Sequence, residues 1–159
     1  MIFRLARIDE LNEILNLYIE ARQEEYCIWN DQYPSMFEIR NDFETNNLFV
    51  MELDNKIVGA ISIVPENEMD DFDEWIIKDN VIEVARVVVE KNYHGKSIAF
   101  SMMNGIINLC KERKNKVIHL ACYVNNPPAI NVYKKLNFNF ICRKNMYEHE
   151  YYLCELIIE

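Results

Sequence analysis

Two segments in the second half of the chain have small and polar residues where they could bind an anion. In the first, the apolar run Val87–Val89 leads through a polar turn, residues 90–96, into a helix that should begin at Ile98. A helix N-terminus presents unpaired backbone amides and partial positive charge, and small residues let a phosphate approach the backbone. The segment predicts a phosphate cradle beside Lys91 and Lys96, with an ordinary strand–helix turn as the alternative.

The second segment, Asn125 to Phe138, follows the next predicted strand and should form a helix from Pro127, since proline is tolerated in the first helical turn. Together the two segments resemble the GNAT superfamily of N-acetyltransferases. The cofactor loop of that family reads Gln/Arg-x-x-Gly-x-Gly/Ala, and its later helix reads Asn-x-x-Ala-x-x-x-Tyr-x-x-x-Gly-Phe. The matching positions here are His94, Ser97 and Ala99 in the loop, and Asn126, Ala129, Tyr133, Asn137 and Phe138 in the helix.

Three positions depart from the family pattern. Ser97 replaces the loop glycine, His94 replaces Gln or Arg, and Asn137 replaces the glycine after the helix. Serine is small and keeps the backbone amide, so the loop should still bind a pyrophosphate with altered affinity. Asparagine tolerates a left-handed backbone, so Asn137 should still end the helix.

The resemblance implies an α/β (α+β) fold, with a mixed central sheet of about seven strands, splayed parallel central strands and helices on both faces. We expect a single domain over residues 1–159, similar to small bacterial members of the superfamily. The pantetheine arm of acetyl-CoA would bind the backbone of the first central strand. The resemblance assigns cofactor binding to Val87, Val88, Val89, His94, Gly95, Lys96, Ser97, Ile98, Ala99, Asn126, Ala129 and Tyr133.

The same resemblance implies direct transfer of an acyl group from acetyl-CoA to a primary amine. Tyr133 would donate a proton to the departing thiolate, because a phenol of pKa ~10 suits a thiol of pKa ~8.5. Glu83 is a charged residue in an apolar strand, where burial would raise its pKa enough for a general base acting through water. Pairing of Glu83 across the sheet is the alternative. Arg86 should face the opposite side if the strand is regular, and His119 is expected to be structural.

Hydrophobic periodicity predicts the order β-α-α-β-β-β-α-β-α-β-β. Asp9 should cap a helix whose buried side is Leu11, Ile14, Leu15, Tyr18 and Ile19. Pro34 and Ser35 should open a second helix with Met36, Phe37, Ile39 and Phe43 on its apolar side. A helical turn could lie around Phe72 to Ile76. The predicted strands are 2–6, 48–53, 57–64, 81–89, 117–124, 138–143 and 151–158, with a tight hairpin at Asp54-Asn55 and helices from Ile98 and from Pro127 to Leu136.

The composition limits the classes of partner and cofactor that we expect the protein to bind. The net charge of −9 argues against nucleic acid, and no apolar run is long enough to span a membrane. Five widely spaced cysteines without a C-x-x-C pair fit reduced thiols better than a metal or disulfide framework, so we expect no metal. The expected protein is soluble and cytoplasmic, as a monomer or homodimer.

Two further functions remain open from the sequence. One is a non-catalytic acyl-CoA-binding regulatory module with a degraded cofactor loop. The other is an interaction domain that holds a basic partner through its acidic run. That run consists of Glu66, Glu68, Asp70, Asp71, Asp73 and Glu74, with no lysine or arginine until Lys78. In an enzyme, the same run beside Trp75 would favour a cationic amine as acceptor.

Overall fold

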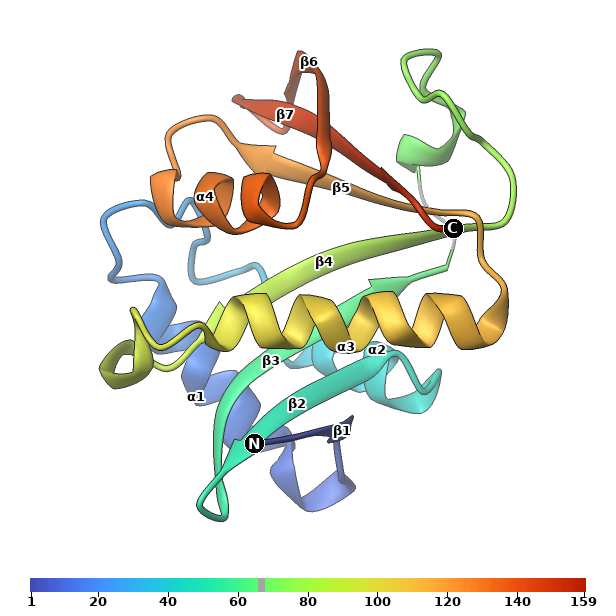
Figure 1. Cartoon of the computed structure of the whole chain (residues 1–159). Helices are drawn as coiled ribbons and strands as arrows, with labels where there is room; N and C mark the ends of the chain where they lie inside the picture. The colour runs from blue at the N-terminus through green and yellow to red at the C-terminus, as the bar shows by residue number, and fades with distance from the viewer. Residues whose placement is uncertain (66–67) are drawn as a thin grey trace. The chain divides into compact units, whose positions relative to one another are not determined.

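The computed structural model describes residues 1–65 and 68–159. Seven strands form a sheet in the order β1-β2-β3-β4-β5-β7-β6, with the helices labelled in Figure 1. The chain divides into two compact units, Met1–Ile63 with Arg86–Gly105, and Val64–Ala85 with Ile106–Glu159. Strand β4 (Val81–Val89) and helix α3 (Ile98–Arg113) each contribute residues to both units. The predicted mixed sheet, element order and central position of β4 are confirmed.

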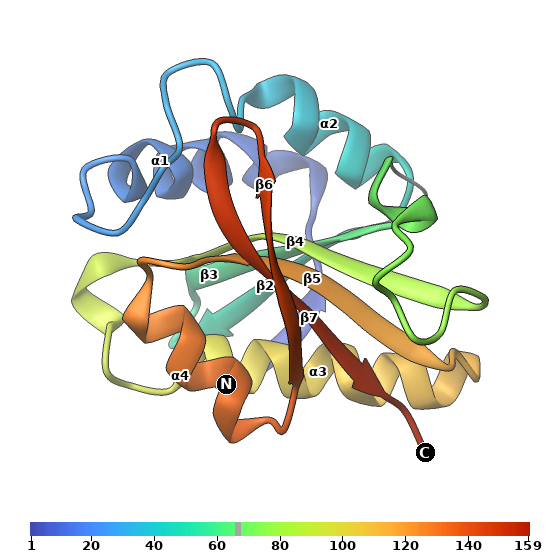
Figure 2. The same cartoon turned by 90° about the horizontal axis from the view of Figure 1, so that it is seen from above.

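The first unit packs helices against both faces of its strands. Strands β1 (Ile2–Leu5), β2 (Leu48–Leu53) and β3 (Lys56–Val64) are antiparallel. Asp54 and Asn55, at φ 52° and 64°, form the predicted tight hairpin between β2 and β3. Helices α1 (Leu11–Ala21) and α2 (Met36–Glu44) cover one face of β2 and β3, and the start of α3 lies on the other face (Figure 2).

The two faces of this unit have different packing. On the α1–α2 face the buried residues are Ala6, Leu11, Ile14, Leu17, Tyr18, Ile39, Leu48, Val50, Ile57, Ala60 and Val88. On the α3 face the helix approaches the strands closely. A Cβ added to Gly59 of β3 would lie 3.0 Å from the Met102 side chain, and one added to Gly105 of α3 would lie 2.3 Å from the Phe3 ring. Small residues at these two positions allow the helix to contact the sheet.

The second unit contains the parallel step of the sheet. Strand β5 (Val117–Tyr123) pairs in parallel with β4, and the pairing runs over Val81–Glu83 with Val117–His119. On its other side β5 pairs with β7 (His149–Ile157), which forms an antiparallel hairpin with β6 (Asn139–Met146). Helix α4 (Pro127–Lys135) connects β5 to β6. Pairing near the starts of β4 and β5 is consistent with strands that separate further on, and that separation stays a prediction.

Several local sequence predictions were wrong. Asp9 lies in the 3₁₀ turn Ile8–Glu10, and Glu10 occupies the N-cap of α1 without a side-chain cap bond. Ile19 is 41% exposed and Phe37 is 78% exposed, although both were predicted on buried faces. The turn expected at Phe72 to Ile76 lies earlier, at Glu68–Asp71. These details depend on which neighbours cover each helix, and hydrophobic periodicity alone does not specify them.

Ile14→Ala should destabilise the protein by about 2–5 kcal/mol, because a fully buried side chain would leave a cavity. Ile19→Ala removes the same atoms from the same helix at an exposed position, and should change stability by only about 0.5 kcal/mol. Urea unfolding of both variants measures the difference. Equal losses would contradict the assignment of the buried face of α1.

Candidate functional site

The loop between β4 and α3 has two residues with a left-handed backbone. After the 3₁₀ turn η3 (Lys91–Tyr93), Gly95 has φ 76° and Ser97 has φ 61°. His94 through Ser97 are exposed, and a Cβ added to Gly95 would meet no atom within 4 Å. Ser97 has the left-handed conformation that glycine adopts most readily. The backbone at Gly95 is open to solvent, and phosphate binding there stays a prediction.

Cationic side chains and one imidazole surround this loop. Lys56 Nζ and Lys96 Nζ lie 5.5 and 5.4 Å from the centroid of the Tyr93 ring. His94 Nε2 lies 3.2 Å from the carbonyl oxygen of Val89, within hydrogen-bond distance. His94 thus connects the loop to the end of β4, and both lysine side chains lie near the Tyr93 ring of η3, while Glu24 Oε1 lies 4.0 Å from His94 Nε2.

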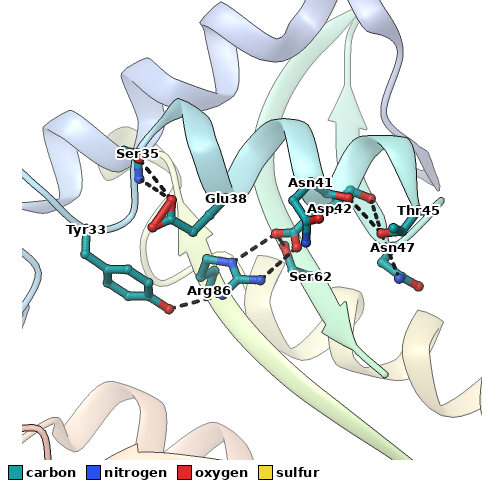
Figure 3. A network of polar contacts seen from close by, with 9 residues as sticks. All are labelled: Tyr33, Ser35, Glu38, Asn41, Asp42, Thr45, Asn47, Ser62 and Arg86. Atoms are coloured by element: carbon teal, nitrogen blue, oxygen red, sulfur yellow. Dashed lines mark hydrogen bonds and ion pairs between the residues drawn. The ribbon is translucent and has the colours of Figure 1, made fainter. Parts of the chain in front are cut away.

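Strand β4 is irregular at Arg86, which has φ 52°. The prediction that Arg86 faces away from Glu83 assumed a regular strand, and that condition fails here. Figure 3 shows Arg86 contacting Asp42 of α2 and Tyr33 of the preceding loop. Val88 is buried in the α1–α2 core, whereas Val87 and Val89 are partly buried.

Helix α4 begins and ends with a capping motif that contains an asparagine. At its start, Asn126 Oδ1 accepts a hydrogen bond from the Ala129 amide at 3.3 Å. At its end, Asn137 has φ 64°. The Asn137 amide donates a hydrogen bond to Lys134 O, and the Phe138 amide donates one to Tyr133 O at 3.0 Å. This is the Schellman pattern, and it confirms that Asn137 serves as the left-handed C-cap.

The C-cap also fixes the surroundings of Tyr133. The rings of Tyr133 and Phe138 meet edge-to-face with centroids 5.5 Å apart. Tyr133 is 7% exposed, and burial raises the pKa of its phenol. The hydroxyl is therefore protonated at neutral pH, as a proton donor must be.

A row of buried ionisable residues crosses β4, β5 and β7 in the second unit. Glu83 is the register partner of His119, and His119 is the register partner of Glu155. Register partners point to the same face of a sheet. Glu83, His119 and Glu155 are 8%, 2% and 0% exposed, and His119 Nε2 lies 2.7 Å from Glu155 Oε2.

Residues 75–77 contact two members of this row, His119 and Glu155. Glu155 accepts hydrogen bonds from the amides of Ile76 and Ile77 at 3.3 and 3.1 Å, and the Trp75 ring stacks on His119 with centroids 3.7 Å apart. Burial lowers the pKa of His119, and the adjacent Glu155 opposes that shift. The expected structural role of His119 fits this packing.

The acidic run is partly neutralised in the structure. Lys144 Nζ lies 2.7 Å from Glu74 Oε1, and Lys78 lies 3.7 Å from Asp73. Glu66 lies outside the described residues. Trp75, expected beside the run as a cation-binding ring, is instead 3% exposed. An exposed ring for an ammonium group is therefore not present at Trp75.

Within residues 1–65 and 68–159, no group of three or more His, Cys, Asp or Glu side chains could hold a metal ion. Over the same residues, no helix is long and apolar enough to cross a membrane. The five cysteines are free, and burial raises the pKa of Cys110 and Cys122 to about 12.

The predicted site residues fall in both compact units. The first unit holds Val87, Val88, Val89, His94, Gly95, Lys96, Ser97, Ile98 and Ala99, and the second holds Glu83, Asn126, Ala129 and Tyr133. A cavity of about 380 Å³ lies elsewhere, lined by Ile8, Asp9, Leu11, Asn12, Met36, Arg40, Phe43 and Glu44. None of the predicted site residues lines that cavity.

Sequence reasoning missed two buried carboxylates, Asp42 and Glu155. For each of them the sequence contains a signal, a charged residue at a position where the pattern expects an apolar one. Asp42 lies between Ile39 and Phe43 on the buried side of a helix, and Glu155 interrupts an apolar strand in the way that Glu83 does. A lone charge at an apolar position indicates a buried partner, and sequence does not identify that partner.

The family model of the acetyltransferase (GNAT) family matches residues 11–138. This chain belongs to that family. It is 27% identical over 139 residues to an uncharacterized N-acetyltransferase of Methanocaldococcus jannaschii, covering 82% of this chain and 57% of the relative, less than two thirds of its length. It is 28% identical over 139 residues to an N-alpha-acetyltransferase of Sulfurisphaera tokodaii, covering 85% of this chain and 78% of that protein.

Solved structures share the fold. A Salmonella typhimurium protein, solved with acetyl-CoA as its cofactor, superposes with a TM-score of 0.79 at 17% identity, covering 100% of this chain and 94% of that one. At this identity the similarity establishes the GNAT fold alone.

Asn137→Ala should destabilise the protein by about 1 kcal/mol, because alanine tolerates φ 64° poorly, whereas Asn137→Gly should preserve stability. Asn131→Ala, at an exposed position within α4, is the matched control and should be neutral or slightly stabilising. Thermal unfolding compares the three variants. A loss in Asn137→Gly as large as that in Asn137→Ala would contradict the C-cap assignment.

Proposed function

We propose that this protein is an acetyl-CoA-dependent N-acetyltransferase that transfers an acetyl group directly to a primary amine. The observation that carries the proposal is the family match over residues 11–138, together with the left-handed loop that opens α3. Acetyl-CoA would supply the thioester. The chain would supply phosphate binding, a proton donor and a proton acceptor.

The residues of the loop fit the anionic part of acetyl-CoA. Gly95 is open to solvent, and Ser97 keeps its amide at the helix start. Lys56 and Lys96 supply positive charge nearby. We infer that the amides of residues 94–99 bind the pyrophosphate, that the backbone of Val87–Val89 binds the pantetheine arm, and that Asn126 and Ala129 contribute from α4.

Tyr133 is the proposed general acid. Attack by the amine forms a C–N bond and breaks the C–S bond, so the departing sulfur must receive a proton. The buried Tyr133 hydroxyl carries a proton at neutral pH. Burial raises this pKa further above the ~8.5 of a thiol, so burial alone works against proton transfer to the thiolate, and the proposal rests on the position of Tyr133 in the helix motif.

Glu83 is the proposed acceptor of the proton that the amine loses, through a water molecule. Its burial and its register position beside His119 and Glu155 support this role. Interacting buried groups of this kind can share a proton. Glu83 lies on β4, the strand whose Val87–Val89 backbone is proposed to bind the pantetheine arm, so it is the member of the row assigned to the base.

The acceptor is proposed to be a primary amine, and two classes are worth separating. The name of the Sulfurisphaera tokodaii relative suggests the α-amino group of a polypeptide. A polycationic amine was suggested by the acidic run, of which Glu74 and Asp73 already contact lysines. The ion pairs reduce the negative field available to attract a cation, so the α-amino group is the favoured acceptor.

The function is tested by binding and turnover. Acetyl-CoA at one hundred times its dissociation constant should stabilise the folded protein by about 2.7 kcal/mol, measured as a rise in melting temperature. Ser97→Gly should keep or increase this shift, since glycine adopts φ 61° readily, and Ala99→Leu should reduce it.

Thiol release from acetyl-CoA should then be screened with peptides bearing a free N-terminus, N-blocked peptides and polyamines. Release with free N-termini would support the proposal. Binding without release across the amine panel would favour the acyl-CoA-binding module, and no thermal shift at millimolar acetyl-CoA would contradict cofactor binding.

Tyr133→Phe should lower kcat by ~10²–10⁴ if proton donation is fully used, with little change in the KM for acetyl-CoA. The ring and its contact with Phe138 remain, so the melting temperature should hardly change. Steady-state thiol release measures both constants. Wild-type kcat in this variant would assign Tyr133 to packing alone.

A further inference from the structure

Arg86 has an unusual backbone conformation for a long side chain. It lies in the middle of β4, at φ 52°, in the left-handed region. An L-residue there brings its Cβ close to the backbone, so this conformation is uncommon outside glycine and asparagine. Such a conformation persists where surrounding contacts hold it in place, and it often lies at a functional site.

The contacts that hold Arg86 come from three neighbouring segments. Arg86 Nε and Nη2 donate to the two carboxylate oxygens of Asp42, at 3.0 and 2.8 Å. Ser62 Oγ of β3 donates to Asp42 Oδ2 at 2.7 Å, and Arg86 Nη1 donates to the Tyr33 hydroxyl at 3.1 Å. Figure 3 shows the guanidinium between Asp42 and Tyr33. A contact through two hydrogen bonds fixes the orientation of the guanidinium plane as well as its distance from the carboxylate.

The pair is shielded from water. The side chains of Arg86 and Asp42 are 11% and 4% exposed. Burial raises the pKa of Asp42, whereas the guanidinium and the Ser62 hydroxyl oppose that shift. Three donors on one carboxylate favour its ionised form. The contact therefore acts as a fixed ion pair within the first unit.

The location of the pair relates it to the cofactor. Residues Val87–Val89, proposed to bind pantetheine, follow Arg86 directly. Their other end is held by the Glu90 amide, which donates to Val58 O at 2.8 Å, and by His94 beside Val89 O. The segment is thus held at both ends, and its direction depends on the left-handed residue that precedes it.

We propose that Arg86 is a positioning residue, whose ion pair with Asp42 holds the left-handed turn in β4 and thereby orients the backbone of Val87–Val89 toward acetyl-CoA. This inference rests on the proposed function. It goes further by assigning cofactor affinity to an ion pair outside the set of residues proposed to bind the cofactor. A purely structural role would affect stability and leave the segment unchanged.

Arg4 provides a matched control. It also lies on a strand of the first unit, pairs with Glu10 and Glu52 at 2.8 and 2.9 Å, and is 17% exposed. Its strand, β1, contributes none of the proposed site residues. Loss of the Arg4 pairs should destabilise the protein without altering Val87–Val89.

The test compares Asp42→Asn, Arg86→Met and Arg4→Met. Amide hydrogen exchange of Val87–Val89 in the ligand-free protein should accelerate by about tenfold in the first two variants and stay unchanged in Arg4→Met, relative to other amides of each variant. The KM for acetyl-CoA should rise by a similar factor in the first two, with a smaller change in kcat. Tyr33→Phe, which removes one hydrogen bond near the surface, should have a smaller effect in the same direction.

Should the single variants fail to fold, Asp42→Leu/Arg86→Met replaces the pair with apolar side chains, a change that is often neutral for stability. Faster exchange at Val87–Val89 in this folded variant would support positioning, and wild-type exchange would overturn it. Exchange requires no ligand, so it separates this inference from the proposed function. If the wild-type protein failed to bind acetyl-CoA, the proposed function would be contradicted. The exchange result would still show whether the ion pair positions Val87–Val89.

Discussion

The ion pair between Asp42 and Arg86 links helix α2 to the middle of β4, the strand that contributes to both compact units. Before Arg86, β4 pairs in parallel with β5 through Val81–Glu83. After Arg86, it leads directly to the loop that opens α3. The side chain that makes this pair also belongs to the left-handed residue, so one contact joins α2 to the irregular point of the strand. If the pair holds that conformation, as proposed, the packing of α2 and the geometry of the site are coupled through a single residue.

The elements that follow local rules were predictable from sequence. Asp54-Asn55 gave the hairpin because both residues tolerate positive φ, and Asn137 ended α4 for the same reason. The observed bounds of β4 equal the predicted ones, because a long run rich in β-branched residues strongly favours a strand over a helix. Ile19 and Phe37 failed because helix faces depend on what covers them. The partners of Asp42 and Glu155 lie 44 and 36 residues away in sequence, a separation that periodicity does not report.

Some residues of the candidate site could be predicted from sequence, whereas their grouping across strands could not. Loop and α4 residues were assigned from a family pattern, and the structure explains why several of them occur there: Ser97 and Asn137 have positive φ, Asn126 caps α4, and Phe138 packs on Tyr133. Glu83 was identified as a charge in an apolar strand, but its place in a row with His119 and Glu155 depends on strand order. Strand order is a tertiary property, so three residues from three strands could not be grouped beforehand.

The scarcity of glycine affects the unfolded chain as well as the fold. The sequence has three glycines, and in the described residues ten non-glycine residues have positive φ, among them Asn46, Asn55, Asn80 and Asn137. A glycine at each turn would enlarge the conformational freedom of the denatured ensemble, whereas asparagine and aspartate restrict it. The protein thus accepts a small enthalpic strain at its turns and loses less chain entropy on folding. Because entropy is weighted by temperature, this exchange favours the folded state more as the temperature rises.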